Sequence, residues 1–348
     1  MSMPIAIAAD HRDPLHDERA QRVTVCADDG TPLAAQVVGP LSATVTVVFV
    51  HGHCLRTESW WFLRDQLLRQ WDSETGGSET GGSETRMVFY DHRGHGESGS
   101  ADPATYTIDQ LGHDLATVLR TLAPTGPVVL VGHSMGAMVV LAYARLFPET
   151  IGIRVIGVGL IATAAAGITT VGLSRLLTQH TVTSFRLAVQ RAPRTMRASK
   201  RLGRRLFEPI VRETGFGTRR VSPRMAALAT AMLNDTPLPT MAHFLDSLIR
   251  FDETATLRLL ADLPVLVLGG SADILIPFAH SVVLAAQLGS AELVRLDGAG
   301  HSVILERAQE VAAAVAALVD RATKESAQIP RAPVLASEPA AQPLAAVG

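Results

Sequence analysis

A serine inside a glycine-rich turn is the side chain in this sequence best placed for covalent chemistry. Residues 132–136 read Gly-His-Ser-Met-Gly and match G-x-S-x-G, a sharp turn that lifts a serine above the end of a parallel sheet. The glycines are needed because a Cβ at either place would crowd the neighbouring strand or helix. Apolar residues 128–131 predict a strand before the turn, and helical spacing over 137–147 predicts a helix after it. We therefore predict that Ser134 is a nucleophile.

A serine hydroxyl needs a base to take its proton, and the base needs an acid to orient it. His301 lies in a glycine-rich loop after the last predicted strand and is the candidate base. Asp273 follows the preceding predicted strand, in a loop that Pro277 closes, and is the candidate acid. The alternatives are a buried structural histidine at 301 and a helix N-cap at 273. The chain order Ser, Asp, His is the one expected for a serine on this kind of turn.

Attack on a carbonyl group builds negative charge on its oxygen, and backbone N–H groups aimed at that oxygen stabilise it by roughly 3 kcal/mol each. We expect one such group from Met135, directly after the nucleophile. We expect the other from His53, in the loop that follows the apolar run 45–50. Only the backbone N–H of His53 is implied, so its side chain is left without a role.

Several further histidines lie near the predicted catalytic residues, so a metal site is an alternative. They are His51, His53, His92, His95 and His133. None has a metal-binding spacing such as H-E-x-x-H, and a Ser-His-Asp set needs no metal. We therefore predict no metal and no cofactor. His133 is taken as the variable residue of the turn, and Asp91 and Arg93 are predicted to pair or hydrogen-bond so that they hold loops.

Alternating strands and helices must position these residues. The predicted strands cover 22–27, 33–38, 45–50, 87–90, 128–131, 154–161, 265–268 and 292–296. The predicted helices cover 59–71, 108–122, 137–147, 278–288 and 304–322. This order predicts an α/β fold with a doubly wound, mostly parallel, eight-stranded sheet. Each candidate group follows a strand, and ligands bind at the carboxyl ends of parallel strands.

The chain changes character where strand signals stop. Residues 175–224 hold thirteen Lys or Arg and two Glu, a balance of +11. A basic stripe at helical spacing is formed by Arg194, Arg197, Arg201 and Arg204. We predict a helical basic cap at 164–251. The other predicted units are a flexible arm at 1–21, a core at 22–163 and 252–323, an acidic Ser-Glu-Thr-Gly-Gly repeat loop at 73–85, and a disordered tail at 324–348.

The composition suits a soluble globular enzyme, with 348 residues, 47% hydrophobic residues and a net charge of −2. The two cysteines, Cys26 and Cys54, form no disulfide framework, and we expect a cytoplasmic protein because no secretory signal is visible. Residues 155–174 carry no charge and would just span a bilayer. Their four glycines and three threonines favour a strand plus loop over a transmembrane helix.

Taken together, the motifs resemble those of the α/β-hydrolase fold family over roughly residues 22–322. They are His51-Gly52, the stretch Asp91-His92-Arg93-Gly94-His95-Gly96-Glu97-Ser98, the turn 132–136, Asp273 and His301. The second stretch is similar to that of bacterial esterases, monoacylglycerol-lipase-like enzymes and cofactor-free haloperoxidases. Ser134 differs from the aspartate nucleophile of the epoxide-hydrolase and haloalkane-dehalogenase branches. The acidic repeat and the basic cap depart from the family pattern.

The resemblance implies a serine hydrolase that cleaves carboxylic esters of lipophilic or acyl substrates through an acyl-enzyme intermediate. The alternatives with the same triad are an acyltransferase and a cofactor-free haloperoxidase or perhydrolase. A non-catalytic binding protein of this fold is the alternative of another class. The basic cap is either a solvated face or a surface for an anionic membrane or an acidic substrate. No nucleic-acid partner is expected, because aromatic residues are scarce in the cap.

Overall fold

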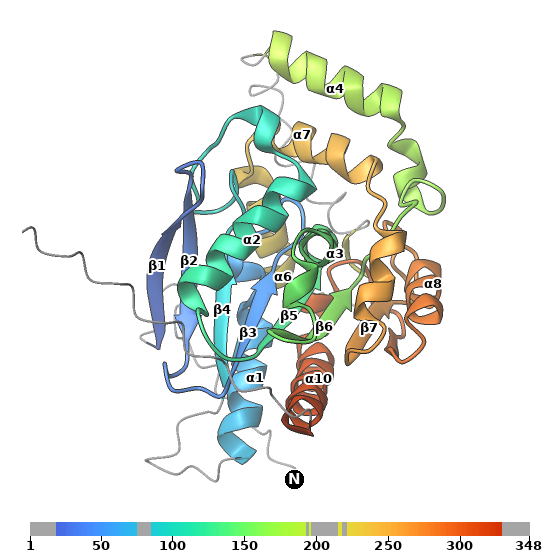
Figure 1. Cartoon of the computed structure of the whole chain (residues 1–348). Coiled ribbons are helices and arrows are strands. Elements are labelled where there is room, and N and C mark those ends of the chain that lie inside the picture. Colours follow the sequence, from blue (N-terminus) through green and yellow to red (C-terminus); the bar gives the residue numbers. More distant parts are fainter. Residues whose placement is uncertain (1–18, 75–84, 193–194, 196–214, 218–220, 329–348) are drawn as a thin grey trace, which may run out of the picture.

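A twisted sheet of eight strands lies at the centre of the structure, with helices packed around it (Figure 1). The computed structural model describes residues 19–74, 85–192, 195, 215–217 and 221–328. The strands are β1 (Ala20–Cys26), β2 (Pro32–Val38), β3 (Val45–Val50), β4 (Thr85–Tyr90), β5 (Val128–His133), β6 (Val155–Ile161), β7 (Val265–Gly270) and β8 (Glu292–Leu296). They lie in the order β1-β2-β4-β3-β5-β6-β7-β8. Pairing is antiparallel around β2 and parallel from β4 to β8, which confirms the predicted sheet.

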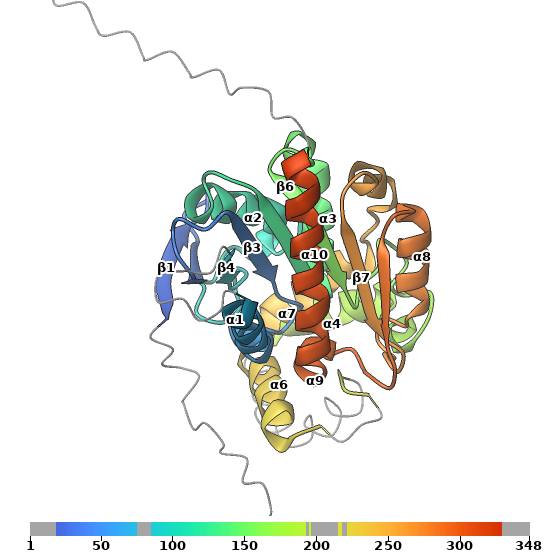
Figure 2. The same ribbon diagram turned by 90° about the horizontal axis from the view of Figure 1, so that it is seen from below.

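Helices cover both faces of this sheet. One face carries α2 (Ile108–Leu122), α3 (Met135–Leu146) and α8 (Ala279–Leu288). The other face carries α1 (Trp61–Glu74), α9 (Val303–Glu306) and α10 (Ala308–Gln328), and Figure 2 shows α10 crossing this face with α1 beside it. Every residue of β3, β5, β6 and β7 is buried, which explains why these strands read as continuous apolar runs and not as alternating ones.

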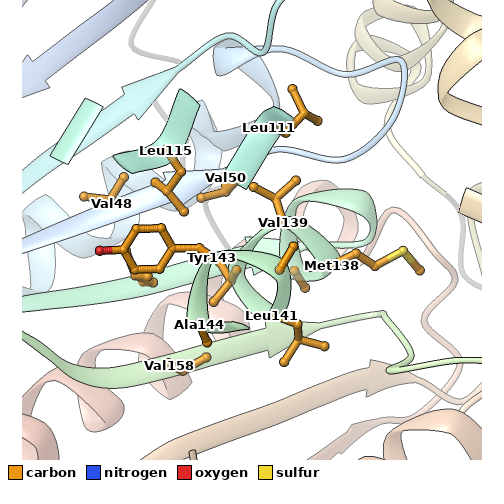
Figure 3. Close-up of a cluster of buried hydrophobic side chains, with 14 of the residues drawn as sticks. Val48, Val50, Leu111, Leu115, Met138, Val139, Leu141, Tyr143, Ala144 and Val158 are labelled. Carbon is orange, nitrogen blue, oxygen red and sulfur yellow. The ribbon is translucent and has the colours of Figure 1, made fainter. Parts of the chain in front are cut away.

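Alternation along β3 divides its side chains between the two layers. Val48 and Val50 point toward α2 and α3, where they meet Leu111 and Val139 (Figure 3). Val47 and Phe49 belong to the cluster on the opposite face. Because neighbouring residues of a strand face opposite sides, a one-residue slip of β3 would exchange the two layers, so the register of this strand is fixed by packing.

Three helices occupy the described part of the inserted segment. They are α4 (Gln179–Arg191), α6 (Pro223–Asp235) and α7 (Leu238–Ile249). In Figure 1, α4 and α7 lie one above the other at the top of the molecule, above α2. The arginine stripe at 194–204, residues 75–84 of the acidic repeat, residues 1–18 and residues 329–348 lie outside the described residues.

Some element boundaries differ from those predicted. Strand β1 begins at Ala20, inside the predicted arm, because it pairs along its whole length with β2. Helix α10 continues to Gln328, so the predicted start of the tail at residue 324 is wrong. The predicted closing helix is split at Arg307 into α9 and α10. Residues 73 and 74 belong to α1 and residue 85 to β4, so the predicted repeat loop is too long at both ends.

The uncharged stretch 155–174 is a strand followed by irregular chain, as predicted. Strand β6 ends at Ile161, and the next regular element is a 3₁₀ turn, Leu173–Leu176. Among the residues that the structure describes, no helix combines the length and the apolar character that crossing a bilayer requires.

Candidate active site

The predicted turn around Ser134 is present between β5 and α3. Ser134 has φ 55° and ψ −120°, a conformation that costs a non-glycine residue roughly 1–3 kcal/mol. A Cβ on Gly132 would lie 2.4 Å from the Ala137 Cα, and one on Gly136 would lie 2.0 Å from the Val50 carbonyl oxygen. Both glycines are therefore required by space, and the serine is held at the tip of the turn.

Backbone strain gathers at the carboxyl edge of the sheet. In the described part of the chain, the non-glycine residues with positive φ are Cys54, Ser134 and Ala162. They follow β3, β5 and β6, which are neighbours in the sheet. The Ser134 N–H donates to the Ile161 carbonyl at 2.8 Å, so the surrounding strands hold the strained turn in place.

The three side chains predicted from the sequence lie within hydrogen-bonding distance of one another. The Ser134 Oγ lies 2.9 Å from the His301 Nε2, and the His301 Nδ1 lies 2.8 Å from the Asp273 Oδ2. The other Asp273 oxygen accepts the Leu275 and Ile276 N–H groups at 2.9 and 2.8 Å, which fixes the carboxylate. A carboxylate acceptor places the hydrogen of His301 on Nδ1, so Nε2 is free to accept the serine proton.

The sequence predicts an oxyanion site formed by two backbone N–H groups, those of His53 and Met135. Met135 is the first residue of α3, so its N–H has no acceptor within the helix. The loop with His53 packs close by, since a Cβ on Gly52 would lie 3.2 Å from the Ser134 Cβ. Within the described residues, neither the His53 N–H nor the Met135 N–H donates to a backbone acceptor. The role of these two N–H groups as oxyanion donors stays a prediction.

Three of the other histidines, His51, His92 and His95, tie the loop after β3 to the loop after β4. The His51 Nδ1 donates to the Gly52 carbonyl at 2.8 Å, and its Nε2 accepts the His92 N–H at 3.0 Å. The His92 Nε2 donates to the His51 carbonyl at 3.0 Å, and the His95 Nε2 accepts the Cys54 N–H at 3.2 Å. These bonds make the histidines a scaffold for the loop that holds the His53 N–H.

Burial keeps these imidazoles neutral. Desolvation lowers the pKa of His53 to about 4 and those of His92 and His133 to about 3. It also holds the pKa values of His51 and His95 well below the usual range. No group of three or more His, Cys, Asp or Glu side chains among the described residues is arranged to hold a metal ion.

Asp91 and Arg93 hold loops, as predicted, although each uses other partners. Asp91 accepts the Thr57 N–H at 2.7 Å and the Glu97 N–H at 2.8 Å, and burial raises its pKa to about 7. The fully buried Arg93 forms ion pairs of 2.7 Å with Asp29 and 2.6 Å with Asp114. Its charge is thereby compensated inside the protein.

Two side chains near the site have contacts that sequence reasoning missed. The His133 Nε2 lies 2.9 Å from the His301 carbonyl oxygen, so His133 is more than the variable residue of the turn. Glu306 accepts the Gly300 N–H at 2.9 Å and the Gly217 N–H at 3.0 Å. No sequence pattern predicts either contact, because the partners are main-chain atoms of other loops.

Comparisons with solved structures agree with this fold. An esterase from Thermogutta terrifontis is 24% identical and superimposes with a TM-score of 0.67, covering 87% of this chain and 99% of that one. A bromoperoxidase from Bacillus anthracis is 17% identical with a TM-score of 0.66, covering 86% of this chain and 100% of that one. These likenesses show the fold.

One curated relative matches locally. The polyketide synthase ThaQ from Burkholderia thailandensis is 42% identical over 77 residues, which make up 22% of this chain and 4% of the synthase. The chain therefore corresponds to a small part of that protein. A model of the alpha/beta hydrolase family matches residues 47–314, a range that includes the turn at Ser134, Asp273 and His301. This chain belongs to the alpha/beta hydrolase family.

Proposed function

We propose that this protein is a serine hydrolase that cleaves carboxylic esters through an acyl-enzyme intermediate. The observation that carries the proposal is the chain of two short contacts, from Ser134 Oγ to His301 Nε2 and from His301 Nδ1 to Asp273 Oδ2. A nucleophile, a base and an orienting acid in this geometry are the parts that acyl transfer requires.

The proposed reaction assigns one task to each group. Ser134 Oγ attacks the ester carbonyl carbon while His301 Nε2 takes the serine proton. Asp273 stabilises the resulting imidazolium, and the N–H groups of His53 and Met135 stabilise the oxyanion. His301 then gives the proton to the leaving alcohol oxygen, and the acyl-enzyme forms. Water attacks the acyl carbon, His301 accepts the water proton and returns it to Ser134, and the acid leaves.

The cap side of the site supports a lipophilic acyl substrate. Phe244 of α7 is fully buried and lies beside the rings of His53 and His95, with centroid separations of 6.3 and 5.5 Å. An apolar side chain of the inserted segment therefore packs against the loop that holds the proposed oxyanion donor. An acyl chain that enters between cap and core gains about 0.8 kcal/mol per buried methylene group.

The same triad supports two other outcomes for the acyl-enzyme. An alcohol that outcompetes water gives acyl transfer, and hydrogen peroxide as acceptor gives a peracid, which is the perhydrolase alternative. Access of each acceptor to the Ser134 ester decides among them. A product assay with and without a second alcohol, and with and without peroxide, separates these activities from hydrolysis.

The test is hydrolysis of p-nitrophenyl esters from acetyl to palmitoyl, together with an acyl thioester, by the wild type and by Ser134→Ala. We expect turnover with a chain-length optimum, and a loss of about 10⁴-fold or more in the variant. Ser281→Ala removes another buried serine hydroxyl, in α8, and should retain activity. If the wild type neither turns over any ester nor labels at Ser134 with a fluorophosphonate, the binding-protein alternative replaces the proposal.

A further inference from the structure

We propose that His133 is a positioning residue that sets the distance between the base His301 and the nucleophile Ser134. The inference rests on the proposed function. His133 directly precedes the serine, and its Nε2 donates to the main-chain carbonyl of His301 at 2.9 Å. The nucleophile turn thus holds the base by its backbone, while the His301 ring reaches back to Ser134 at 2.9 Å.

The protonation state of His133 follows from its partner and its burial. A carbonyl oxygen only accepts, so the hydrogen must be on Nε2. The residue is 1% exposed, and desolvation lowers its pKa to about 3, so the imidazole is neutral at neutral pH. Its Nδ1 is buried and has no hydrogen-bond partner in the described part of the chain. The protein therefore tolerates one unsatisfied nitrogen at this position while it makes the bond to His301.

Packing on two sides restricts rotation of the His133 ring. The Trp60 ring meets it edge-on, with centroids 6.4 Å apart and planes at 90°. The His301 ring lies at 5.2 Å with planes at 49°. A ring held in this way keeps its Nε2 aimed at one point, so the hydrogen bond acts as a spacer of fixed length.

The loop around His301 is held at three successive residues, each by a different element. The Gly300 N–H donates to Glu306, and the Ser302 N–H donates to the Gly215 carbonyl at 2.6 Å. The third bond, from His133 to the His301 carbonyl, is the one that comes from the turn that carries Ser134. It therefore transmits the position of Ser134 to the base directly. A misplacement of reacting groups by 1 Å can cost about 10²-fold in rate.

The test compares two substitutions at one position. His133→Leu removes the donor while it keeps a buried apolar side chain, and we expect kcat to fall by about 10–100-fold with little change in KM. Labelling of Ser134 by a fluorophosphonate should slow by the same factor, because both reactions need His301 as base. His133→Gln offers an amide donor near the position of the imidazole Nε2 and should restore most of the rate.

Val315→Ala serves as the stability control, because it destabilises buried packing in α10 without touching the site. If His133→Leu is no slower than Val315→Ala at a comparable thermal midpoint, or if His133→Gln is as slow as His133→Leu while folded, the positioning role is overturned. The low-field proton resonance of the His301 Nδ1–H gives a readout that does not depend on turnover. It should shift or broaden in His133→Leu and recover in His133→Gln. An inactive wild type with this NMR pattern would refute the proposed function and leave the positioning role standing.

Discussion

At the scale of single residues, the two oxygens of Asp273 have separate tasks. Oδ1 accepts the Leu275 and Ile276 N–H groups, while Oδ2 faces the His301 Nδ1. In Asp273→Asn the amide oxygen can keep the backbone bonds, which places the amide nitrogen opposite His301. The imidazole must then present the wrong tautomer to Ser134.

We therefore expect Asp273→Asn to fold normally and to lose about 10³–10⁴-fold in kcat. The measurement is ester turnover together with the thermal midpoint. The partial return of activity at high pH, where hydroxide can assist the serine, would support this explanation. An unfolded variant, or one with wild-type kcat, would contradict it.

The proposed catalytic residues could be predicted because each follows a strand and carries a reactive side chain. Ser134, Asp273 and His301 have this property, and the structure brings the three together. The contacts of His133 and Glu306 could not be predicted, because their partners are main-chain groups of distant loops. Sequence spacing shows which side chains can meet, but main-chain partners depend on the completed fold.

At the scale of elements, the turn between β5 and α3 tolerates no added atom at its two glycines. In Gly136→Ala the new Cβ would lie 2.0 Å from the Val50 carbonyl, so β3 and α3 would have to separate. We expect a loss of more than about 3 kcal/mol in stability, seen as insoluble expression or a lower thermal midpoint. Gly126→Ala is a matched control, since the space around Gly126 is open and only its positive φ is strained.

Glu306 at the end of α9 connects two segments that lie far apart in the sequence. Its carboxylate accepts N–H groups from Gly300, next to the proposed base His301, and from Gly217, in the inserted segment. Glu306→Ala leaves both donors without this acceptor, and we expect kcat to fall by about tenfold and the thermal midpoint to decrease. Glu306→Gln keeps an amide oxygen and should lie nearer the wild type. Equal activity of all three proteins would contradict this role.

Most elements were predictable because buried parallel strands are continuous apolar runs. Strands β3 and β8 match their predicted ranges. The break at Arg307 was not predictable, because apolar spacing continues across it. The position of the break coincides with hydrogen bonds to another loop. Glu306 accepts the Gly300 N–H, and Arg307 donates to the Asp297 carbonyl at 3.1 Å.

At the scale of the whole molecule, the buried histidines make stability depend on pH. His53, His92 and His133 have folded-state pKa values of about 4, 3 and 3, below the value of about 6.5 expected for the unfolded chain. Between these values the unfolded chain binds protons that the folded protein does not. The free energy of unfolding must therefore decrease as pH falls below about 6.5.

Asp91 acts in the opposite direction. Its folded-state pKa of about 7 lies above the usual 3.8. Between these two pH values the folded protein binds a proton that the unfolded chain has lost, which cancels the effect of about one histidine on the free energy of unfolding. The three histidines less Asp91 leave about two protons, so we expect a net loss of roughly 3 kcal/mol per pH unit below pH 6.5, measured by urea unfolding at several pH values. The lowered pKa values of His51 and His95 steepen this slope further. In His92→Gln one proton-binding difference is removed, so the free energy of unfolding should change with pH by about 1.4 kcal/mol per pH unit less than in the wild type. A flat profile would mean that the buried histidines are protonated in the folded protein.

Exposed apolar side chains gather beside the loop that holds Asp273. Val171, Leu173, Leu176 and Ile274 are 40, 39, 68 and 43% exposed, and the Leu173 N–H donates to the Ile274 carbonyl at 2.7 Å. Residues 175–224 carry a positive balance in the sequence, and contact of the protein with an anionic membrane stays a prediction. We expect sedimentation with anionic vesicles that salt weakens and Leu176→Glu abolishes. Equal binding to neutral vesicles would exclude a role for charge.

The order of strands from β5 to β8 also has a consequence for synthesis of the chain. In this half of the sheet the strands are added in chain order, and β8, the edge strand, comes last. A nascent chain can therefore build the sheet outward from β5, with Ser134 in place long before His301 leaves the ribosome. Until then Ser134 lacks its proposed base, so under the proposed mechanism a chain that stalls before β8 has no activity.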